Sequence, residues 1–597
     1  MQIKSIVNRF PTQMNRSLSA IIFWIVLLFA TQAVAGVPEV LTQFYLYESP
    51  LTKDFFAANG AAYDAMKDRW KSYLRRSTSS FKEVNRANLL TGLRPGVLVL
   101  ASAVLLDDQE REAVDRFSAS GGSVLLTWGT GARNAKGKWV GYGFLEKLLE
   151  MKVVGKVEFE SNERFLNTFG DGPLSWSLPA GERVFLGEIA ETPIRVDSPN
   201  LAARYFDWQR APTPKNTNGA VAFLEKNGSR RVYFGFSEAS WDYDERLRLP
   251  KLIDSVVSWL QHIPTVSKAA WPNGGLSAQL LEMDTEEKFR NALNFAAELD
   301  KAQIRGTFYC LTSVAKDFRD VVQNLLQKHE IGYHADVHYG FKGKSIDNQK
   351  DRLDTMVSDM KGLVGNRVLP SMTGFRAPTE SWDTNTEKLL RQIGVRHHVA
   401  DPGSSESRLP FFSLSEPDLN ADQAIVVLPR TQMDDLNYLG LKLDFQKASA
   451  LIMLDFDYLH EAGALGILSV HSQNYGDDGL MAKLTPPYVK RLEKYRQDVW
   501  AASGQEISDW WRERERVAFQ SGPLIGGRFT FAVQAPGQVK GLSLVVTHPA
   551  RDAVVKRVDA ISANTPIPEL VHLDAWRSVL IFRNELKVGS YSYSLTF

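Results

Sequence analysis

The segment Lys328–His338 reads KHEIGYHADVH and joins a strand pattern to a pair of histidines. Ile331–His338 is strand-like, and His334 and His338 are four residues apart, so a turn brings both imidazoles to one cation. Asp284, at the end of an earlier strand, is the candidate oxygen ligand. Two neutral imidazoles and a carboxylate suit zinc or a similar divalent ion. Such a three-ligand site leaves positions for water and substrate, as a catalytic metal requires.

On both sides of this segment, strand-like runs alternate with helical segments, from about residue 276 to residue 516. Each run ends beside polar residues, and in β/α barrels the reacting groups project from the carboxyl ends of the strands. Seven of the ten histidines lie between His329 and His471, so imidazole chemistry is expected in this region. The strand-like runs are Ile304–Leu311, Ile331–His338, Val395–Ala400 and Gly466–His471.

Four patches of this region, taken in order, resemble the motifs of the polysaccharide deacetylase family, the NodB-homology domain of carbohydrate esterase family four. They are QLLEMDTE at Gln279–Glu286, KHEIGYHADVH at Lys328–His338, GFRAPT at Gly374–Thr379 and ILSVH at Ile467–His471. The resemblance covers residues 276–512. It implies a distorted β/α barrel that hydrolyses acetyl groups on an N-acetylated or O-acetylated carbohydrate.

The resemblance also implies roles for individual residues. Asp284, His334 and His338 would hold the metal, with Zn²⁺ as the expected ion. The ion would polarise the acetyl carbonyl and lower the pKa of bound water, so that hydroxide attacks near neutral pH. His471, which ends the last motif, would protonate the leaving amine. Arg376, in the third motif, would pair with a catalytic carboxylate and keep it ionised.

The base that takes the proton from water is the open point of this assignment. The family's first motif has adjacent aspartates, whereas Met283 stands directly before Asp284 here. Glu282 is the favoured base, because strand alternation puts it on the same side as Asp284. Glu286 and Asp336 are alternatives, and Glu282 could instead orient a metal-binding histidine.

The family has a further motif between the third and the last. Its counterpart here is the segment His397–Gly403, which reads HHVADPG. Asp401 stands where that motif supports the catalytic carboxylate. His397 and His398 are expected to pack in the core or line the substrate groove. They are not expected to bind the metal.

The N-terminal sequence predicts export. Three basic residues precede the apolar run Ala20–Ala30, and Ala33–Ala35 fits a signal-peptidase site. Residues 1–35 are therefore interpreted as a signal peptide. An uncleaved anchor is the alternative, although the run is shorter than the roughly 20 residues of a membrane helix. The mature chain is expected in the periplasm or the medium, with no stable membrane span.

Composition is that of a folded, several-domain chain. The 597 residues carry 70 Lys plus Arg against 69 Asp plus Glu, a formal charge of +1, and 44% are hydrophobic. This charge gives no global reason to bind nucleic acid. Cys310 is the only cysteine, which excludes internal disulfides, thiolate metal clusters and paired-cysteine redox chemistry.

Residues 36–265 alternate strand-like and helical runs, which predicts a flavodoxin-like α/β domain. Val97–Leu100 and Ser123–Thr127 are its clearest strands. The region resembles class I glutamine amidotransferase-like folds in its Leu98–Leu106 strand and Gly121-Gly122 turn. It contains no cysteine nucleophile, so the domain is expected to be noncatalytic.

Residues 266–515 are assigned to the barrel, and the pattern changes after them. Short alternating apolar runs over residues 516–597, among them Arg528–Val533 and Ser590–Thr596, predict a β-sandwich. This domain has no metal-ligand spacing and is also expected to be noncatalytic.

Together these features predict an exported, metal-dependent deacetylase of an acetylated cell-envelope or exopolysaccharide glycan, with N-acetylhexosamine favoured. The main alternative is a catalytically silent barrel that binds glycan in a polysaccharide assembly or export system, because Met283 replaces the usual aspartate. A third reading is a hydrolase of the same fold that acts on a small amide.

Overall fold

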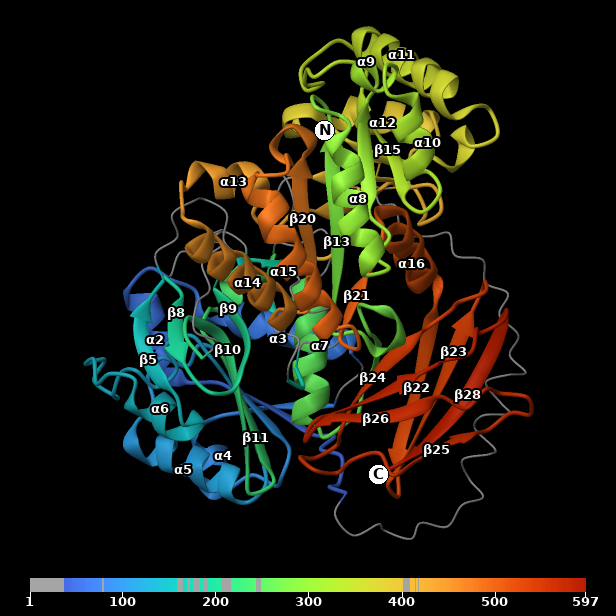
Figure 1. The fold of residues 1–597 in the computed structure, drawn as a ribbon. Coiled ribbons are helices and arrows are strands. Elements are labelled where there is room, and N and C mark those ends of the chain that lie inside the picture. The colour runs from blue at the N-terminus through green and yellow to red at the C-terminus, as the bar shows by residue number, and fades with distance from the viewer. Residues whose placement is uncertain are drawn as a thin grey trace.

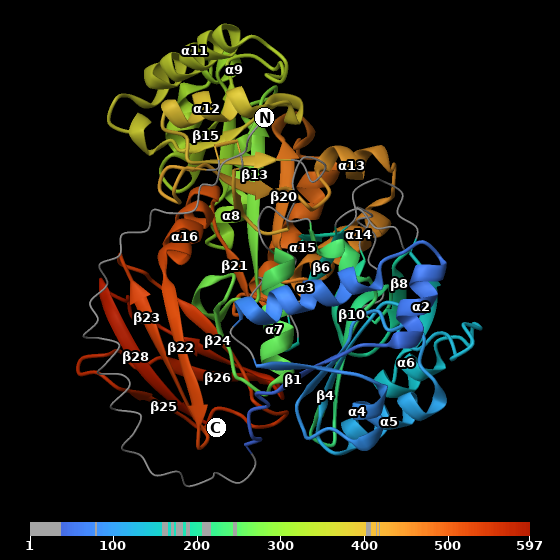
Figure 2. The same ribbon diagram turned by 180° about the vertical axis from the view of Figure 1, so that it is seen from behind.

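The computed structural model describes residues 37–77, 80–157, 165–168, 172–174, 183–186, 192–205, 216–242, 248–400, 408–413, 415–416 and 418–597. The predicted signal peptide and Asp401 lie outside these residues. Three units follow one another along the chain and pack side by side, as both views show (Figures 1 and 2). Within the described part, no helix combines the length and the apolar character that crossing a membrane requires.

The first unit is built on a mixed sheet in which eleven strands are described. Strands β2, β1, β3, β4 and β11 lie in that order and pair in parallel. The predicted strands Val97–Leu100 and Ser123–Thr127 are β3 and β4. The remaining strands of the sheet pair antiparallel, an extension that the sequence pattern does not predict.

The elements of the first unit are β1 (Phe44–Tyr47), α2 (Pro50–Ala58), α3 (Tyr63–Arg76), β2 (Phe81–Val84), α4 (Arg86–Thr91), β3 (Val97–Leu100), α5 (Asp108–Ala119), β4 (Ser123–Thr127), α6 (Gly143–Leu149), β5 (Lys152–Lys156), β6 (Phe165–Thr168), β7 (Arg183–Phe185), β8 (Ile194–Asp197), β9 (Leu201–Tyr205), β10 (Gly219–Lys226), β11 (Ser229–Phe234), η1 (Glu238–Asp242) and α7 (Arg248–Leu260).

Helices cover both faces of this sheet, because its parallel strands are apolar on both sides. Phe44 and Leu46 of β1 face a core shared with α3 and α7. Tyr45 and Tyr47 of the same strand face a second core, shared with α4, α5 and α6. The alternation of side chains along one strand thus builds a three-layer unit.

The second unit is a curled β/α sheet with the strand order β18, β19, β17, β16, β15, β14, β13, β20, and β21 beside β13. All of its pairs are parallel except β18 with β19. The four strands predicted in this region correspond to β14, β15, β17 and β20. Among the described residues, no pairing joins β20 to β18 or β19, so the sheet is an open half-barrel.

The elements of the second unit are η2 (Pro272–Gly274), β13 (Ser277–Thr285), α8 (Asn291–Lys301), β14 (Thr307–Leu311), α9 (Thr312–Ala315), α10 (Arg319–Leu325), β15 (Glu330–Ala335), α11 (Ile346–Val364), η3 (Leu369–Ser371), β16 (Gly374–Arg376), η4 (Pro378–Glu380), α12 (Thr384–Gln392), β17 (His397–Ala400), β18 (Phe411–Phe412), β19 (Val426–Pro429), α13 (Asp435–Gly440), α14 (Phe445–Glu461), β20 (Leu465–His471), η5 (Ser472–Asn474), α15 (Leu480–Lys494), β21 (Val499–Ala501) and α16 (Gly504–Arg516).

The third unit consists of two antiparallel sheets, in the orders β12, β24, β27, β26 and β22, β23, β28, β25. Buried residues of both sheets belong to one core with α16 and the inner side chains of the half-barrel. Residues 266–268, assigned to the barrel from the sequence, form β12, which pairs with β24 of this unit. The strands are β12 (Val266–Lys268), β22 (Ala518–Ile525), β23 (Arg528–Ala535), β24 (Ser543–Thr547), β25 (Arg557–Ala560), β26 (Glu569–Asp574), β27 (Arg577–Ile581) and β28 (Gly589–Thr596).

Candidate active site

The candidate site lies at the carboxyl ends of β13 and β20, the central strands of the half-barrel. Ala278 and Leu280 of β13 belong to the apolar core inside the half-barrel, whereas Leu281 and Met283 face the core under the helices. Side chains alternate along a strand, so Glu282 and Asp284 continue the inner face after Leu280. The inner face of β13 therefore changes from apolar to acidic toward the end of the strand.

Strand β20 shows a similar change, from apolar to polar residues, in register with β13. Its residue Ser469 is the partner of Glu282, and His471 is the partner of Asp284. The Nε2 atom of His471 lies 3.6 Å from Oδ2 of Asp284. The pairing of two parallel strands thus brings the first and last sequence motifs together, as expected for groups at the carboxyl ends of barrel strands.

Arg376, at the end of β16, is the cation that compensates the buried carboxylates of β13. Its Nε lies 2.7 Å from Oδ2 of Asp284, its Nη1 contacts Glu282, and its Nη2 lies 3.0 Å from Oε1 of Glu380. Burial would lower the pKa of Arg376, but the charges of Asp284, Glu282 and Glu380 raise it well above its ordinary value. This guanidinium stays charged and fixes both carboxylates of the strand.

The two carboxylates differ in their surroundings. Glu282 is fully buried, and burial raises its pKa although the charge of Arg376 opposes the effect. Asp284 is also buried, but its Oδ1 has no hydrogen-bond partner and lies 3.9 Å from Nδ1 of His334. Oε2 of Glu282 likewise has no hydrogen-bond partner, so the two carboxylates differ mainly in that Asp284 lies beside the imidazoles of His334 and His471.

Glu286, His334 and His338 form the set of side chains whose geometry suits a metal. One ligand atom from each lies within 4.8 Å of the others, and no other such set occurs among the described residues. Oε1 of Glu286 lies 2.9 Å from Nε2 of both histidines. The sequence-based prediction placed Asp284 in this set. Asp284 instead pairs with Arg376, and Glu286 is the carboxylate that contacts both histidines.

A local irregularity of β15 directs His334 toward the site. Cys310 pairs with Tyr333 and Leu311 pairs with Ala335, so His334 is the extra residue of a β-bulge. Ala335 follows with a φ of 115°, a backbone conformation that L-residues rarely adopt. The strand ends there, three residues before the predicted end at His338. The chain then turns, which brings His338 back beside His334.

The donor set fits a divalent cation. Nδ1 of His334 donates to the carbonyl oxygen of Arg376 at 2.9 Å, so Nε2 is the ring nitrogen that faces Glu286. Burial would raise the pKa of Glu286, but the hydrogen bond from His334 and the nearby imidazoles lower it to about 2. Two imidazole nitrogens and an ionised carboxylate oxygen are the ligands that zinc takes in three-ligand catalytic sites.

Arg352 forms a brace on the loop that carries His338. The sequence pattern did not predict this contact. Arg352 of α11 donates to Oδ1 of Asp336 at 2.9 Å and to the carbonyl oxygens of residues 337, 339 and 340. Its guanidinium also lies 4.2 Å from the ring of Phe341. Asp336, considered as a base from the sequence, is therefore a partner of Arg352. Arg352 lies on the following helix and belongs to none of the motifs, so nothing in the sequence indicated its contact with this loop.

His471 has a carboxylate partner that the sequence analysis also missed. Oδ1 of Asp435 lies 2.7 Å from Nδ1 of His471, and Oδ2 accepts the His471 backbone N–H at 2.8 Å. Burial would lower the pKa of His471, but the hydrogen bond with Asp435 and the charges of Asp284 and Asp435 raise it to about 9. The signal was present: Asp434-Asp435 follows the apolar strand β19.

The remaining histidines of the region lie outside this cluster. His397 and His398 are buried beside Glu330 and Glu387, at 3.2 and 2.8 Å. Gln473, in contrast, belongs to the site, because its Nε2 donates to Oε2 of Glu286 at 2.7 Å and orients that carboxylate.

Part of the half-barrel matches a known protein family. Residues 289–398 match the family model described as polysaccharide deacetylase. The matched segment includes His334, His338 and Arg376, and it begins after Asp284 and Glu286. No curated protein sequence matches the chain.

Solved structures of similar shape span several activities. Agd3, described as a novel carbohydrate deacetylase, is 11% identical, with 94% of this chain and 100% of its own covered and a TM-score of 0.39. PuuE allantoinase is 16% identical, with 40% and 92% covered and a TM-score of 0.34. BA3943, a CE4 family pseudoenzyme from Bacillus anthracis, is 12% identical, with 40% and 68% covered and a TM-score of 0.29.

Proposed function

We propose that this chain is an exported, metal-dependent carbohydrate deacetylase that removes acetyl groups from an acetylated envelope or exported glycan. The family match to residues 289–398 supports the reaction class. The signal-like N-terminal sequence supports export. N-acetylated hexosamine is the proposed substrate, with an O-acetyl ester as the second choice.

The proposed metal ligands are Glu286, His334 and His338, whose ligand atoms lie within 4.8 Å of one another. This proposal revises the expectation from the sequence, in which Asp284 was the carboxylate ligand. When bound, a divalent cation such as Zn²⁺ polarises an acetyl carbonyl and lowers the pKa of water. The bulge at His334 and the brace on the loop of His338 hold the two imidazoles in place for it.

Asp284 is the proposed general base, in place of Glu282. Its Oδ1 is unpartnered and faces His334, while its Oδ2 is fixed by Arg376. A carboxylate held in this way can take a proton from the attacking water. Glu282 is also buried and also contacts Arg376, but its cross-strand partner is Ser469, whereas that of Asp284 is His471. The proposed role of Glu282 is to fix Arg376.

His471 is the proposed general acid. Its Nε2 lies 3.6 Å from Asp284, on the side of the cluster opposite His334, and its pKa of about 9 keeps it protonated at neutral pH. The proton from water goes to Asp284, and the proton on His471 goes to the leaving nitrogen, so the acetamide becomes acetate and a free amine. Asp435 orients the imidazole and stabilises its charge.

One observation carries this proposal: a base candidate, an acid candidate and a set of three metal-binding side chains converge at the ends of β13, β15 and β20. The test is acetate release by the metal-stripped mature chain, with and without zinc, from N-acetylglucosamine polymers and peptidoglycan. Zinc-dependent release that His338→Ala abolishes is the expected result. If no divalent metal restores release while the chain still binds glycan, the half-barrel is a silent glycan-binding domain.

A further inference from the structure

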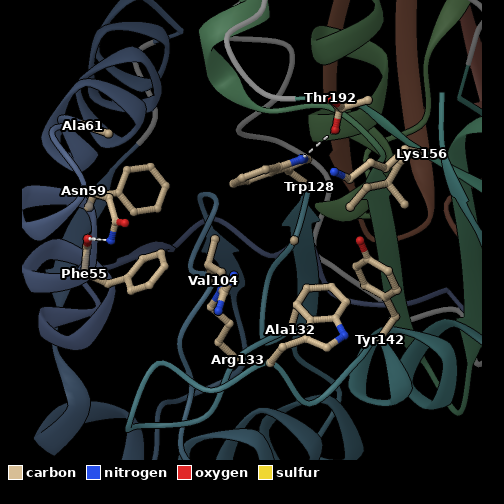
Figure 3. A pocket seen from close by; sticks show the side chains of 14 residues that line it. Phe55, Asn59, Ala61, Val104, Trp128, Ala132, Arg133, Tyr142, Lys156 and Thr192 are labelled. Atoms are coloured by element: carbon tan, nitrogen blue, oxygen red, sulfur yellow. Dashed lines mark hydrogen bonds between the residues drawn. The ribbon is translucent and has the colours of Figure 1, made fainter. Parts of the chain in front are cut away.

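The first unit contains a cavity that the proposed chemistry does not use. Its volume is 620 Å³, and all of its lining residues lie between Phe55 and Ile194. The candidate active site is built from residues 282–471 of the half-barrel, so the two sites share no side chain. Figure 3 shows Phe55 and Tyr142 on opposite sides of the cavity.

The position of the cavity in the sheet is one where α/β proteins bind ligands. Its lining comes from the segments that follow β1, β3 and β4, which are parallel neighbours. In the strand order β2, β1, β3, β4, the chain leaves β1 for one side of the sheet and returns to the other. Ligands of open parallel sheets bind outside the carboxyl ends of the strands at such a switch point.

Aromatic side chains form the walls. Phe55 and Phe56 come from α2, and Trp128, Trp139 and Tyr142 follow β4. The rings of Trp139 and Tyr142 meet edge to face at 4.9 Å. Trp139 is 49% exposed, so a large ring remains open at the cavity instead of packing in a core. Such rings offer flat apolar surfaces to the faces of sugar rings.

The backbone of Trp128 is in the left-handed region, with a φ of 46°. A bulky residue rarely adopts this conformation, because it is sterically strained. The conformation places the indole across the cavity, where its Nε1 donates to the carbonyl oxygen of Thr192 at 3.1 Å (Figure 3). Strain kept at a cavity wall is typical of a binding site.

The polar groups of the cavity are cationic. The guanidinium of Arg133 lies 4.9 Å from the ring of Phe55 and 5.8 Å from that of Trp139, and one of its nitrogens donates to a backbone carbonyl. Lys156 is the second cation. The described lining contains no carboxylate. The cavity can therefore donate charged hydrogen bonds to carbonyl and hydroxyl oxygens, and it repels cations.

We propose that this cavity binds acetylated, uncharged sugar residues of the glycan and discriminates against the deacetylated, cationic ones. The sugar faces stack on the aromatic walls, and Arg133 and Lys156 donate to acetyl and hydroxyl oxygens. The choice of an acetylated glycan rests on the proposed function. The cavity would hold the chain on stretches that still carry acetyl groups and release stretches that have lost them.

Binding to the metal-stripped mature chain tests this proposal separately from turnover. The probes are a pentamer of N-acetylglucosamine and a pentamer of glucosamine, measured by titration calorimetry at about pH 6, where free amino groups are charged. Trp139→Ala and Lys156→Ala are the variants, because both side chains are exposed and their loss leaves folding intact. Phe445→Ala, an exposed aromatic of α14, is the matched control.

The expected result is binding of the acetylated pentamer that weakens by about tenfold or more in Trp139→Ala, weakens in Lys156→Ala and is unchanged in Phe445→Ala. The glucosamine pentamer should bind at least about tenfold more weakly. Equal binding of both pentamers, no binding, or binding that neither variant changes would overturn the proposal. Acetate release distinguishes the two hypotheses: release without cavity-dependent binding overturns only the cavity site, and the reverse overturns only the deacetylase.

Discussion

Two buried acidic clusters of this molecule lie at the ends of parallel strands, and they are built differently. In the first unit, Glu238 accepts hydrogen bonds from Ser102 at 2.6 Å, Thr127 at 2.7 Å and Trp70 at 2.9 Å. All three donors are neutral, and burial raises the pKa of Glu238. In the half-barrel, the buried carboxylates are matched by Arg376 and by imidazoles.

The difference shows what the strand ends of an α/β sheet need for chemistry. The neutral donors satisfy the oxygens of Glu238 and lower its pKa, but they offset the effect of burial only in part, so the pKa stays raised. Arg376 places a positive charge beside its carboxylate partners, and the half-barrel cluster reaches solvent through His338, whose side chain is 41% exposed. Charge compensation and access, rather than the architecture, separate the candidate active site from a structural cluster.

The largest expected effect is on turnover, and it should distinguish a substitution at Asp284 from one at Glu282. Asp284→Asn should lower kcat for acetate release by about 10²–10⁴-fold, because the amide cannot accept the proton from water. The variant should still bind zinc, since Asp284 lies outside the proposed ligand set. Steady-state kinetics and zinc titration measure the two quantities.

Glu282→Gln is the matched control for this prediction. Its effect on kcat should be smaller than that of Asp284→Asn, because Glu282 acts only through Arg376. If Glu282→Gln abolishes turnover while Asp284→Asn abolishes zinc binding, the assignment made from the sequence is right, and Glu286 is not the ligand.

The second prediction concerns a variant that lacks the cation beside the buried carboxylates. Arg376→Met should lower the free energy of unfolding by about 3–5 kcal/mol at neutral pH, because it leaves buried carboxylates without a cation. Urea unfolding measures this loss. Arg391→Met, which removes a half-buried ion pair with Glu416, is the control and should cost about 1 kcal/mol or less. Equal losses in the two variants would show that Arg376 has no special structural role.

The third prediction concerns pH. Asp435→Asn should move the alkaline limb of the rate profile to lower pH by about 1–3 pH units, because a carboxylate partner favours the charged imidazole. In the unchanged protein, His471 loses its proton near pH 9, so activity should fall above that pH. An alkaline limb that Asp435→Asn leaves unmoved would exclude His471 as the acid.

The fourth prediction tests the brace on the loop of His338. Arg352→Met should weaken zinc binding by about 10–100-fold, because the loop carbonyls of residues 337–340 lose their common donor. Competition with a zinc-binding dye measures this affinity without any turnover. Lys350→Met, on the same helix and paired only with exposed Asp354, is the control and should bind zinc normally. Unchanged affinity in Arg352→Met would remove Arg352 from the site.

The sequence was sufficient for those parts of this comparison that depend on local pattern. Ser123–Thr127 and Val97–Leu100 are strands because each is a short apolar run bounded by turn residues. The four-residue spacing of His334 and His338 indicated a common cation in the same way. Arg376 was likewise expected beside a carboxylate, and its contacts with Asp284 and Glu282 confirm that contact.

The sequence was less informative where a contact joins side chains that lie far apart along the chain. Asp284 and Glu286 are both acidic and two residues apart, but Arg376 of another strand pairs with Asp284, and Glu286 contacts Nε2 of both His334 and His338. Asp435 and Arg352 act through contacts across 36 and 15–16 residues of chain. Side-chain pairs of this kind leave no periodic signal.

The smallest expected effect is that of a substitution at Glu238, whose three hydrogen-bond donors are neutral. Glu238→Gln preserves size and hydrogen bonding, so acetate release should not change. Because the pKa of Glu238 is raised in the folded protein, its carboxyl group stabilises the fold most below its ordinary pKa of 4.5, and this stability is lost as pH rises toward the folded value. Glu238→Gln should therefore be less stable than the unchanged protein at about pH 5 and gain relative to it at about pH 8. Urea unfolding at both values measures the difference. If the stability lost in Glu238→Gln grows with pH, Glu238 is ionised in the folded protein. The two clusters would then not differ in the charge of their carboxylates.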